Sequence, residues 1–546
     1  MIQWRCFSQR QRPNSAEDCI IDAQPGQPPI RDWRSSMRML FSRPVLTMLF
    51  LGFSAGIPLL LIFSSLSLWL REAGVDRSTV TYFSWAALAF SFKFLWAPLV
   101  DRMPLPVLTN LLGRRRGWLL LSQLCVAGSI LLMSQVNPST PGALNTMALA
   151  VVMLGFSAAT QDIVIDAFRI ESADKELQAL LSSTYIAGYR IGMLTSGAGA
   201  LVLASYFGSS SEAYDYSAWR MTYMCMALTM GVGLLTTLLV HEPLLSKPLA
   251  HRYRTQEYLK FLMIFLMCIG VFVMVYLRTA GAVTSIKQWV EPFVDTSAMS
   301  GLLVALWSFL VETLRLCFGF AVVVIFVRLI ALTPLYEKAL VHETYVEPVL
   351  DFFQRYGLKL ALLLLLFVGF YRVSDIVLGV ISNVFFQDMG FTKNEIATVV
   401  KTFGLLMTIL GGFLGGFLAL RFGVMKTLYL GAFLTVATNL LFMLLAQAGH
   451  DIMMLYVVIS ADNLTAGLAS AAFVAFLSSL TNISFTAVQY AIFSSLMTLL
   501  PKMIGGYSGS MVDTIGYEYF FLVASLIGLP VLVLIYLIQR HAQFRR

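Results

Sequence analysis

Runs of about 20 mostly apolar residues recur along this chain, and they constrain its fold more than any other feature. A helix needs about 20 such residues to cross the hydrocarbon core of a bilayer. Hydrophobic residues make up 58% of the 546 residues and charged residues only 12%, against roughly 25% charged in soluble proteins. We therefore predict an all-α polytopic membrane protein with fourteen spans, at residues 45–70, 80–101, 117–136, 143–167, 180–206, 219–240, 260–279, 301–332, 358–386, 394–420, 426–447, 452–478, 485–508 and 518–539.

Basic residues are distributed unevenly between the connections. Alternate connections contain clusters such as Arg114-Arg115-Arg116, whereas 137–142 and 449–451 contain no Lys or Arg. Because cytoplasmic loops are the ones enriched in Lys and Arg, we predict that both termini are cytoplasmic. The net charge of +8 then reports topology, and no nucleic-acid partner is expected. Residues 1–43 lack the apolar region of a signal peptide and are expected to be a disordered, basic cytoplasmic segment.

The chain repeats weakly. Residues 69–80 and 386–397 are short external turns, and 100–102 and 420–426 are basic turns after the next span. The repeat predicts two parallel six-helix halves, 44–241 and 358–540, which is the arrangement of the major facilitator fold. Residues 242–357 do not repeat and are expected to be an insertion with a cytoplasmic linker and two extra spans, followed at the other end of the chain by a short tail, 541–546. We interpret the extra pair, in which Glu312 and Arg315 stand three residues apart, as an accessory, with a direct role in transport as the alternative.

Asp162 and Asp166 lie in a stretch that is otherwise apolar from residue 143 onward. Their spacing of four places both on one face of a helix, with Gln161 beside them. A carboxylate within a membrane usually faces a protein interior or a water-filled path. The alternative is that Asp166 and Arg169 form only the solvated cytoplasmic end of the helix.

Further charged residues fall within predicted spans, and intramembrane charge indicates function by default. The cations suit a substrate with carboxylates or phosphates, and the aspartates suit proton transfer because burial raises a carboxyl pKa. The alternative is internal ion pairing that only fixes helix packing, as between Arg372 and Asp375. The cations are Lys93, Arg190, Arg372, Lys401 and Lys502, and the acids are Asp162, Asp375 and Asp462.

Other residue types add less. Tyr189 and Tyr371 offer aromatic faces and hydroxyl groups suited to sugar rings, and glycine pairs such as Gly52 with Gly56 allow helices to approach closely. All five histidines fall at predicted helix ends or in loops, and the six cysteines show no metal-binding spacing. With no metal cluster and no Ser/His/Asp set in view, an enzyme is not expected.

Several motifs together resemble the AmpG family of muropeptide permeases. They are FKFLWAPLVDR (92–102), GRRRGW (113–118), ATQDIVID (159–166), GYRIGM (188–193), KTFG (401–404), DN (462–463), AAFVA (471–475) and SFTAVQY (484–490). The resemblance implies proton-driven import of anhydromuropeptides (GlcNAc-anhydroMurNAc and its peptides) from periplasm to cytoplasm, for peptidoglycan recycling and β-lactamase induction. It also implies a bacterial inner-membrane protein, without a cofactor or metal, whose partners are a small glycopeptide substrate and the lipid bilayer, and which works as a monomer.

On this basis each site residue is assigned a role. Substrate contacts are expected at Lys93, Gln161, Arg190, Arg372, Lys401, Gln489, Tyr189, Tyr371 and Asn463. Proton coupling is expected at Asp162, Asp375 or Asp462. Gating is expected at Asp101, Arg102, Arg114, Arg115, Arg116 and Asp166.

The sequence departs from the family pattern at Val488, where a polar Thr is expected, and at Leu420, which occupies the place that Asp101 has in the first half. Two alternatives remain open: a carrier of another anionic substrate, such as acyl-CoA or a drug, and a membrane sensor that binds without transport.

Overall fold

In a computed structural model of the chain, every regular element is a helix among the described residues, which are 42–75, 83, 88–173, 177–209, 213–243, 255–288, 298–333, 338–392, 395–505 and 508–541. The expected disordered segment, 1–43, lies almost wholly outside them. The first group of helices is α2 (Arg43–Leu60), η1 (Leu61–Ser65), α3 (Leu66–Glu72), α5 (Leu88–Phe92), η3 (Lys93–Leu95), α6 (Ala97–Arg102), α7 (Leu108–Leu112), α8 (Arg114–Ser134), α9 (Ala143–Glu171), α10 (Gln178–Leu194), η4 (Thr195–Gly199), α11 (Ala200–Tyr206), α12 (Tyr216–Thr229) and α13 (Gly231–Leu239).

The rest of the chain supplies a connecting set of helices and a second group. The connecting set is α14 (Thr255–Arg278), α15 (Ala280–Gln288), α16 (Ala298–Ile330), α17 (Lys338–Val341), η6 (His342–Val346) and α18 (Glu347–Phe370). The second group is α19 (Val373–Asp388), η7 (Ile396–Phe403), α21 (Gly404–Phe422), α22 (Val424–Ala448), α23 (Ile452–Leu480), η8 (Ile483–Phe485), α24 (Thr486–Gly505) and α25 (Ser508–Arg540).

Eleven stretches of helix in the described residues are long and apolar enough to cross a membrane. They correspond to eleven of the fourteen predicted spans. Of the other three, 80–101 is interrupted at η3, 301–332 coincides with α16, and 485–508 coincides with the shorter apolar helix α24. The polytopic all-α class is confirmed, and the number fourteen stays a prediction.

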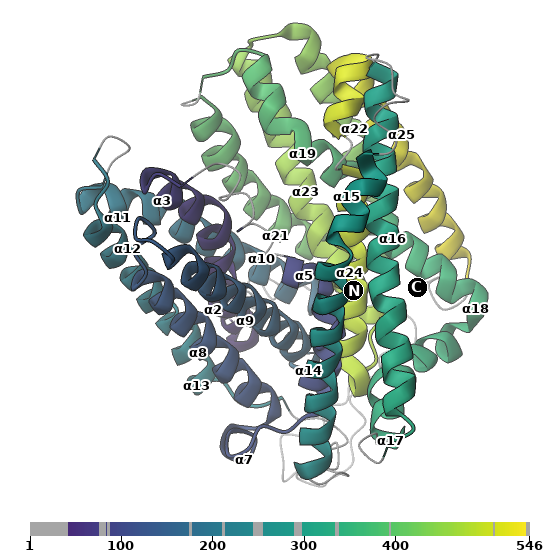
Figure 1. Cartoon of the computed structure of the whole chain (residues 1–546). Coiled ribbons are helices and arrows are strands. Elements are labelled where there is room, and N and C mark those ends of the chain that lie inside the picture. The colour runs from purple at the N-terminus through teal and green to yellow at the C-terminus, as the bar shows by residue number, and fades with distance from the viewer. Residues whose placement is uncertain are drawn as a thin grey trace, which may run out of the picture.

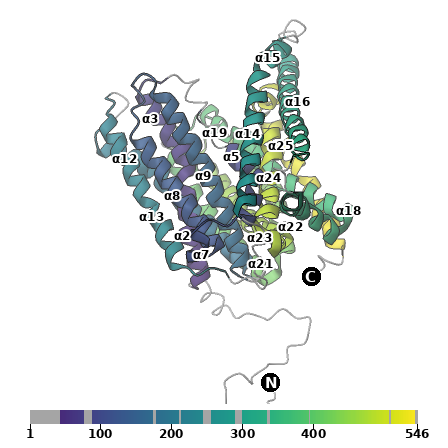
Figure 2. The same ribbon diagram turned by 60° about the horizontal axis from the view of Figure 1, so that its bottom comes forward.

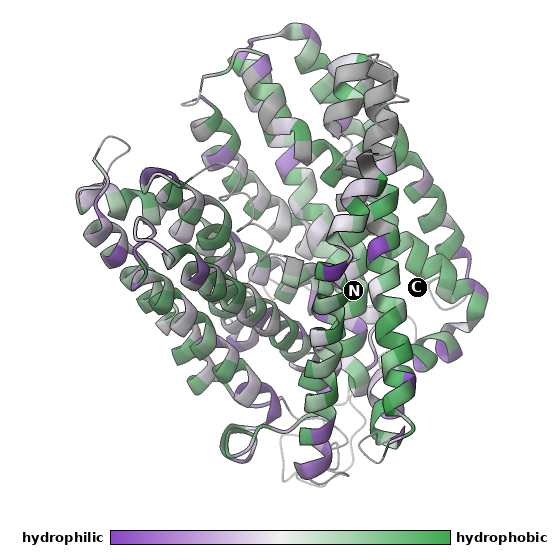
Figure 3. Cartoon of the chain, in the orientation of Figure 1, coloured by the Kyte–Doolittle hydropathy of each residue, from purple (hydrophilic) through white to green (hydrophobic). Residues whose placement is uncertain are grey.

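The two groups of helices stand side by side, with the connecting helices α14, α15 and α16 in front of them in Figure 1. The first group is drawn in purple to blue and the second in green to yellow, and Figure 2 shows the same division after a turn of 60°. α10 contacts α21 and α23 of the second group, and α24 contacts α5, α6 and α9 of the first. Figure 3 shows that hydrophobic residues cover most of the visible helix surface, as expected of a surface that faces lipid.

Glycines make equivalent turns in the two groups. Gly113 (φ +92°) precedes α8 and Gly423 (φ +89°) precedes α22, each at the start of a long helix that follows a basic turn. Positive φ is readily adopted by glycine because it has no Cβ. Gly357 (φ +71°) bends α18 at the boundary predicted between the insertion and the second half.

Small residues bring two pairs of helices into backbone contact, as their clustering in the sequence predicts. A Cβ atom on Gly188 of α10 would lie 2.0 Å from the Leu49 carbonyl oxygen of α2. A Cβ atom on Gly411 of α21 would lie 2.0 Å from the Leu464 carbonyl oxygen of α23. Such contacts hold membrane helices together without a hydrophobic driving force. The first contact positions α10, which carries Tyr185 and Arg190.

The two groups meet at one end of the molecule, which carries Arg102, Arg114 and Arg421 and is called the basic end below. Ala179, Ala419 and Ala475 form a small apolar cluster between the groups there. In Figure 1 the groups touch toward the bottom, near α7, and diverge toward the top. The structure is therefore closed at the basic end and open at the opposite end.

Candidate functional site

Lys93 is positioned by a break in a helix. The helical path from α5 to α6 is interrupted by the single 3-10 turn η3, and Phe92 and Trp96 on its two sides have φ near −104° and −113°. Trp96 anchors the break, since its indole N–H donates to the Thr160 hydroxyl of α9 at 3.1 Å. Pro98 then begins α6, a position that suits proline because the first helical N–H groups have no partner within the helix.

The Lys93 ammonium group lies between the two aspartates of α9. It forms a close ion pair with Asp162 and lies 3.6 Å from an Asp166 carboxylate oxygen. The prediction that these aspartates share one helix face is therefore confirmed. The Tyr185 hydroxyl also donates to Asp162 at 2.9 Å. Lys93 is 4% exposed, and breaking such a buried pair by removing one partner typically costs about 3–5 kcal/mol.

Arg169 extends this cluster to the second group of helices. Its guanidinium group pairs with Asp166 at 3.1 Å and donates to the hydroxyl groups of Ser182 (2.9 Å) and Ser478 (2.8 Å). It also lies over the Tyr490 ring, 5.2 Å from the centroid. Asp166 and Arg169 are both buried, so the alternative that they form a solvated helix end is wrong. Two cations and two carboxylates balance within this cluster.

A second buried cluster joins the groups at the basic end. Arg115 pairs with Asp101 at 2.7 Å and with Glu171 at 2.5 Å. The remaining oxygens face the start of α24: Thr486 donates its hydroxyl to Glu171 at 2.7 Å, and the Val488 backbone N–H donates to Asp101 at 3.2 Å. The contact at residue 488 uses the backbone, so it is compatible with Val in place of the expected Thr.

The other residues expected to act in gating lie around this cluster. Arg114 lies 3.6 Å from Glu171, and Arg102 lies over the Phe485 ring, 5.4 Å from the centroid. Arg116 donates to the Thr237 carbonyl oxygen within the first group. Leu420, in the place that corresponds to Asp101, packs against an apolar core instead. The charged latch is therefore made by the first group alone.

A third set of charges brings the two groups together away from the basic end. Arg372 and Asp375 form an ion pair three residues apart, as the packing alternative predicted. Arg190 of α10 interacts electrostatically with both of them, and Asp462 of α23 does so as well. Tyr189 interacts with Arg190 and with Asp162. The predicted residues Lys93, Asp162, Tyr189, Arg190, Arg372, Asp375 and Asp462 thus form one polar track from the first group to the second.

Other residues expected at the substrate site lie elsewhere. Gln161 is fully buried within the first group and donates to the Ser54 hydroxyl at 2.8 Å. Asn463 links α21 to α23 by accepting a hydrogen bond from the Thr408 hydroxyl at 2.9 Å. Lys401 is exposed on η7. The structure does not join these three to the polar track.

Gln489 and Tyr371 also have other partners. The Gln489 amide group accepts from Arg355 at 2.9 Å and donates to Asp351 and to the Pro348 carbonyl oxygen, each at 2.8 Å. It therefore fastens α24 to α18 in this conformation. Tyr371 donates to a carbonyl oxygen of α22 and stacks on Phe473 with ring centroids 4.3 Å apart.

Sequence reasoning missed Glu171, Arg169, Tyr185 and Ser478 as functional candidates. Glu171 and Arg169 stand near a predicted helix end, where a charge is normally solvated. A usable signal was their spacing, because Asp166 precedes Arg169 by three residues and Glu171 by five, which extends the polar face by more than one turn. No comparable signal marks Ser478, since its partner Arg169 is 309 residues away.

Comparison with known proteins adds two kinds of likeness. Residues 45–207 match the family described as acetyl-coenzyme A transporter 1. The chain is 30% identical over 488 residues to "Putative transporter AmpG 4" of Rickettsia conorii, covering 89% of this chain and 94% of that one. It is 28% identical over 500 residues to "Anhydromuropeptide permease" of Escherichia coli, covering 91% and 80% of the two chains.

Two solved structures are similar in fold. One is the major facilitator proton:xylose symporter XylE (TM-score 0.53, 12% identity, covering 90% of this chain and 94% of that one). The other is a bacterial homologue of ferroportin in an outward-facing state (TM-score 0.54, 11% identity, covering 91% and 99%). At such identities the likeness shows the fold alone. The predicted major facilitator fold is confirmed, and the relatives are transporters rather than enzymes.

Proposed function

The chain belongs to the AmpG family of transporters, and from that membership we propose that it imports anhydromuropeptides from periplasm to cytoplasm in exchange for the energy of the proton gradient. The observation that carries the proposal is the polar track between the two groups of helices, from Lys93 to Arg372. In a major facilitator fold the substrate site lies between the halves near the midplane. The track places cations and titratable carboxylates in that position.

The basic end is assigned to the cytoplasm of a bacterial inner membrane. Cytoplasmic loops of membrane proteins are enriched in Lys and Arg, and the loops at this end carry Arg102, Arg114 and Arg421. With this orientation the open end faces the periplasm. The conformation is then the one that receives substrate, with Asp101, Arg115 and Glu171 holding the cytoplasmic side shut.

Substrate recognition rests on the two arginines that face each other across the halves. Anhydromuropeptides combine a sugar pair with a peptide that bears carboxylates. Arginine binds planar carboxylates through two parallel N–H donors. Arg190 and Arg372 lie near each other and share the nearby Asp375, so an incoming carboxylate can take over part of the role of that aspartate. Tyr189 supplies an aromatic surface beside them for a sugar ring.

Proton coupling is assigned to Asp162. While it is ionised, Lys93 and Arg169 are balanced by Asp162 and Asp166. A proton on Asp162 removes one negative charge and leaves the cluster with one uncompensated cation. That cation attracts an anionic substrate and changes the load on Arg169, whose hydrogen bond to Ser478 crosses between the halves. Asp375 and Asp462 are the other candidates for this role.

The test is uptake of radiolabelled GlcNAc-anhydroMurNAc into proteoliposomes, with and without an imposed proton gradient. Accumulation that depends on the gradient supports both substrate and coupling. Facilitated equilibration without accumulation retains the substrate and rejects the coupling. Saturable binding without any uptake indicates a sensor.

A second candidate is transport of an acyl-coenzyme A. It is favoured by one observation, the match of residues 45–207 to the acetyl-coenzyme A transporter family. The same cations suit its phosphates. Acetyl-coenzyme A that competes with muropeptide uptake, or is itself accumulated, identifies this alternative.

A further inference from the structure

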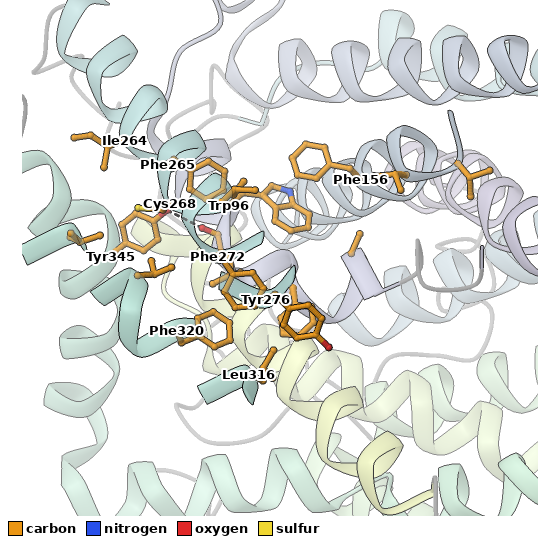
Figure 4. Close-up of a pocket in the computed structure, with 18 of the residues that line it drawn as sticks. Trp96, Phe156, Ile264, Phe265, Cys268, Phe272, Tyr276, Leu316, Phe320 and Tyr345 are labelled. Carbon is orange, nitrogen blue, oxygen red and sulfur yellow. Dashed lines mark hydrogen bonds between the residues drawn. The ribbon is translucent and has the colours of Figure 1, made fainter. Parts of the chain in front are cut away.

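A large cavity separates the inserted helices from the first group. It has a volume of about 1110 Å³ and lies between α5, η3 and α9 on one side and α14 and α16 on the other. Figure 4 shows Trp96 and Phe156 in one wall and Phe265, Phe272 and Phe320 in the facing wall. It lies outside the polar track and is not used by the transport mechanism above.

The lining leaves little for water to bind. Nearly all of the lining side chains are apolar, and two of the polar groups already have partners: Tyr345 donates to the Leu95 carbonyl oxygen at 2.9 Å, and Trp96 donates to Thr160. A buried water needs two to four polar partners, and empty apolar cavities are of the order of 150 Å³. A cavity of this size and character calls for an apolar occupant.

The surroundings identify that occupant. α14 is the least buried of the candidate spans, and its outward residues Leu266 and Met274 are 57% and 56% exposed. The cavity is thus continuous with a surface that faces the hydrocarbon of the bilayer. Its lining runs along α14 from Phe261 to Tyr276, a rise of about 22 Å. One leaflet of a hydrocarbon core of about 30 Å is about 15 Å deep, so a lipid chain fits within this length.

We propose that an acyl chain of a membrane phospholipid occupies this cavity and joins the inserted helix pair to the first half. The chain packs against Phe92, Leu95 and Trp96, which form the back of the segment that carries Lys93. The bound lipid therefore supports the broken helix from behind. This inference does not rest on the proposed substrate.

Native mass spectrometry of the full chain tests the site. The protein is purified in a mild detergent, delipidated and titrated with 1-palmitoyl-2-oleoyl-phosphatidylethanolamine. The wild type is expected to retain one phospholipid at low lipid excess. Cys268→Trp places an indole ring in the cavity and is expected to reduce the lipid-bound fraction at least tenfold. Cys317→Trp is the matched control, because Cys317 lies on the other inserted helix, is exposed and does not line the cavity.

A variant of the opposite wall keeps the test decisive if Cys268→Trp fails to fold. Ala148→Phe on α9 fills the same cavity from the first half and is expected to give the same loss. The proposal is overturned if the wild type binds no phospholipid, or if folded cavity variants retain as much lipid as the wild type and Cys317→Trp. Because the measurement does not involve uptake, its failure leaves the transport proposal untouched.

Discussion

Asp101 and Val488 are joined across the two halves by a single hydrogen bond, from the backbone N–H of Val488 to a carboxylate oxygen of Asp101 at 3.2 Å. The other oxygen of Asp101 pairs with Arg115, which also binds Glu171. One carboxylate thus ties a charge cluster of the first half to the start of α24 in the second. Its loss should weaken the closed basic end more than it weakens either half.

Asp101→Ala is expected to open the basic end. It leaves the Val488 N–H without its partner and Arg115 with only one close acid, and uncompensated buried charge typically costs several kcal/mol. Spin labels at Leu111 and Phe422, both exposed at this end on opposite halves, should report a new population at longer distance by electron–electron double resonance. Asp451→Ala, which removes a helix cap distant from this cluster, should leave the distribution as in the wild type. Identical distributions for Asp101→Ala and the wild type would refute the latch.

Lys93→Ala is expected to abolish uptake and lower thermal stability. The substitution leaves Asp162 and Asp166 facing each other without the cation between them, at a cost of about 3–5 kcal/mol. Adding Asp162→Asn removes one of the two acids, so the double variant should recover most of the lost melting temperature. Uptake should stay absent in both. A double variant no more stable than Lys93→Ala contradicts the assigned charge balance.

The sequence predicted the class of fold well because spans, basic loops and glycine pairs are local signals. It also placed Asp162 and Asp166 on one face, since a spacing of four fixes that within any helix. What it did not give is which residues meet across elements. Gln489 has the same composition signal as a substrate contact, yet its amide is consumed by Asp351 and Arg355 of α18. Partners more than a hundred residues apart are decided by packing, which no periodicity in one sequence records.

Gly411→Ala and Gly412→Ala are expected to differ sharply in stability. A Cβ atom at residue 411 would lie 2.0 Å from the Leu464 carbonyl oxygen, whereas one at residue 412 meets only an atom 4.0 Å away. Overpacking typically costs about 1–3 kcal/mol, and Ala is otherwise favoured over Gly within a helix by about 1 kcal/mol. Thermal unfolding in detergent should show a lowered melting temperature for Gly411→Ala and none for Gly412→Ala. Equal values would mean that α21 and α23 do not pack this closely.

Asp162→Asn separates the proton from the substrate. The amide keeps the size of the side chain and can still accept the Tyr185 hydrogen bond, but it cannot release a proton. Lys93 retains Asp166 at 3.6 Å, so the segment that carries it should stay in place. Accumulation of GlcNAc-anhydroMurNAc driven by an imposed proton gradient should therefore be lost, while exchange of labelled for unlabelled substrate continues at close to the wild-type rate. Asp451→Asn, at an exposed helix cap, is the control and should behave as the wild type. If Asp162→Asn still accumulates substrate against a gradient, coupling moves to Asp375 or Asp462, and the same pair of assays on Asp375→Asn and Asp462→Asn decides between them.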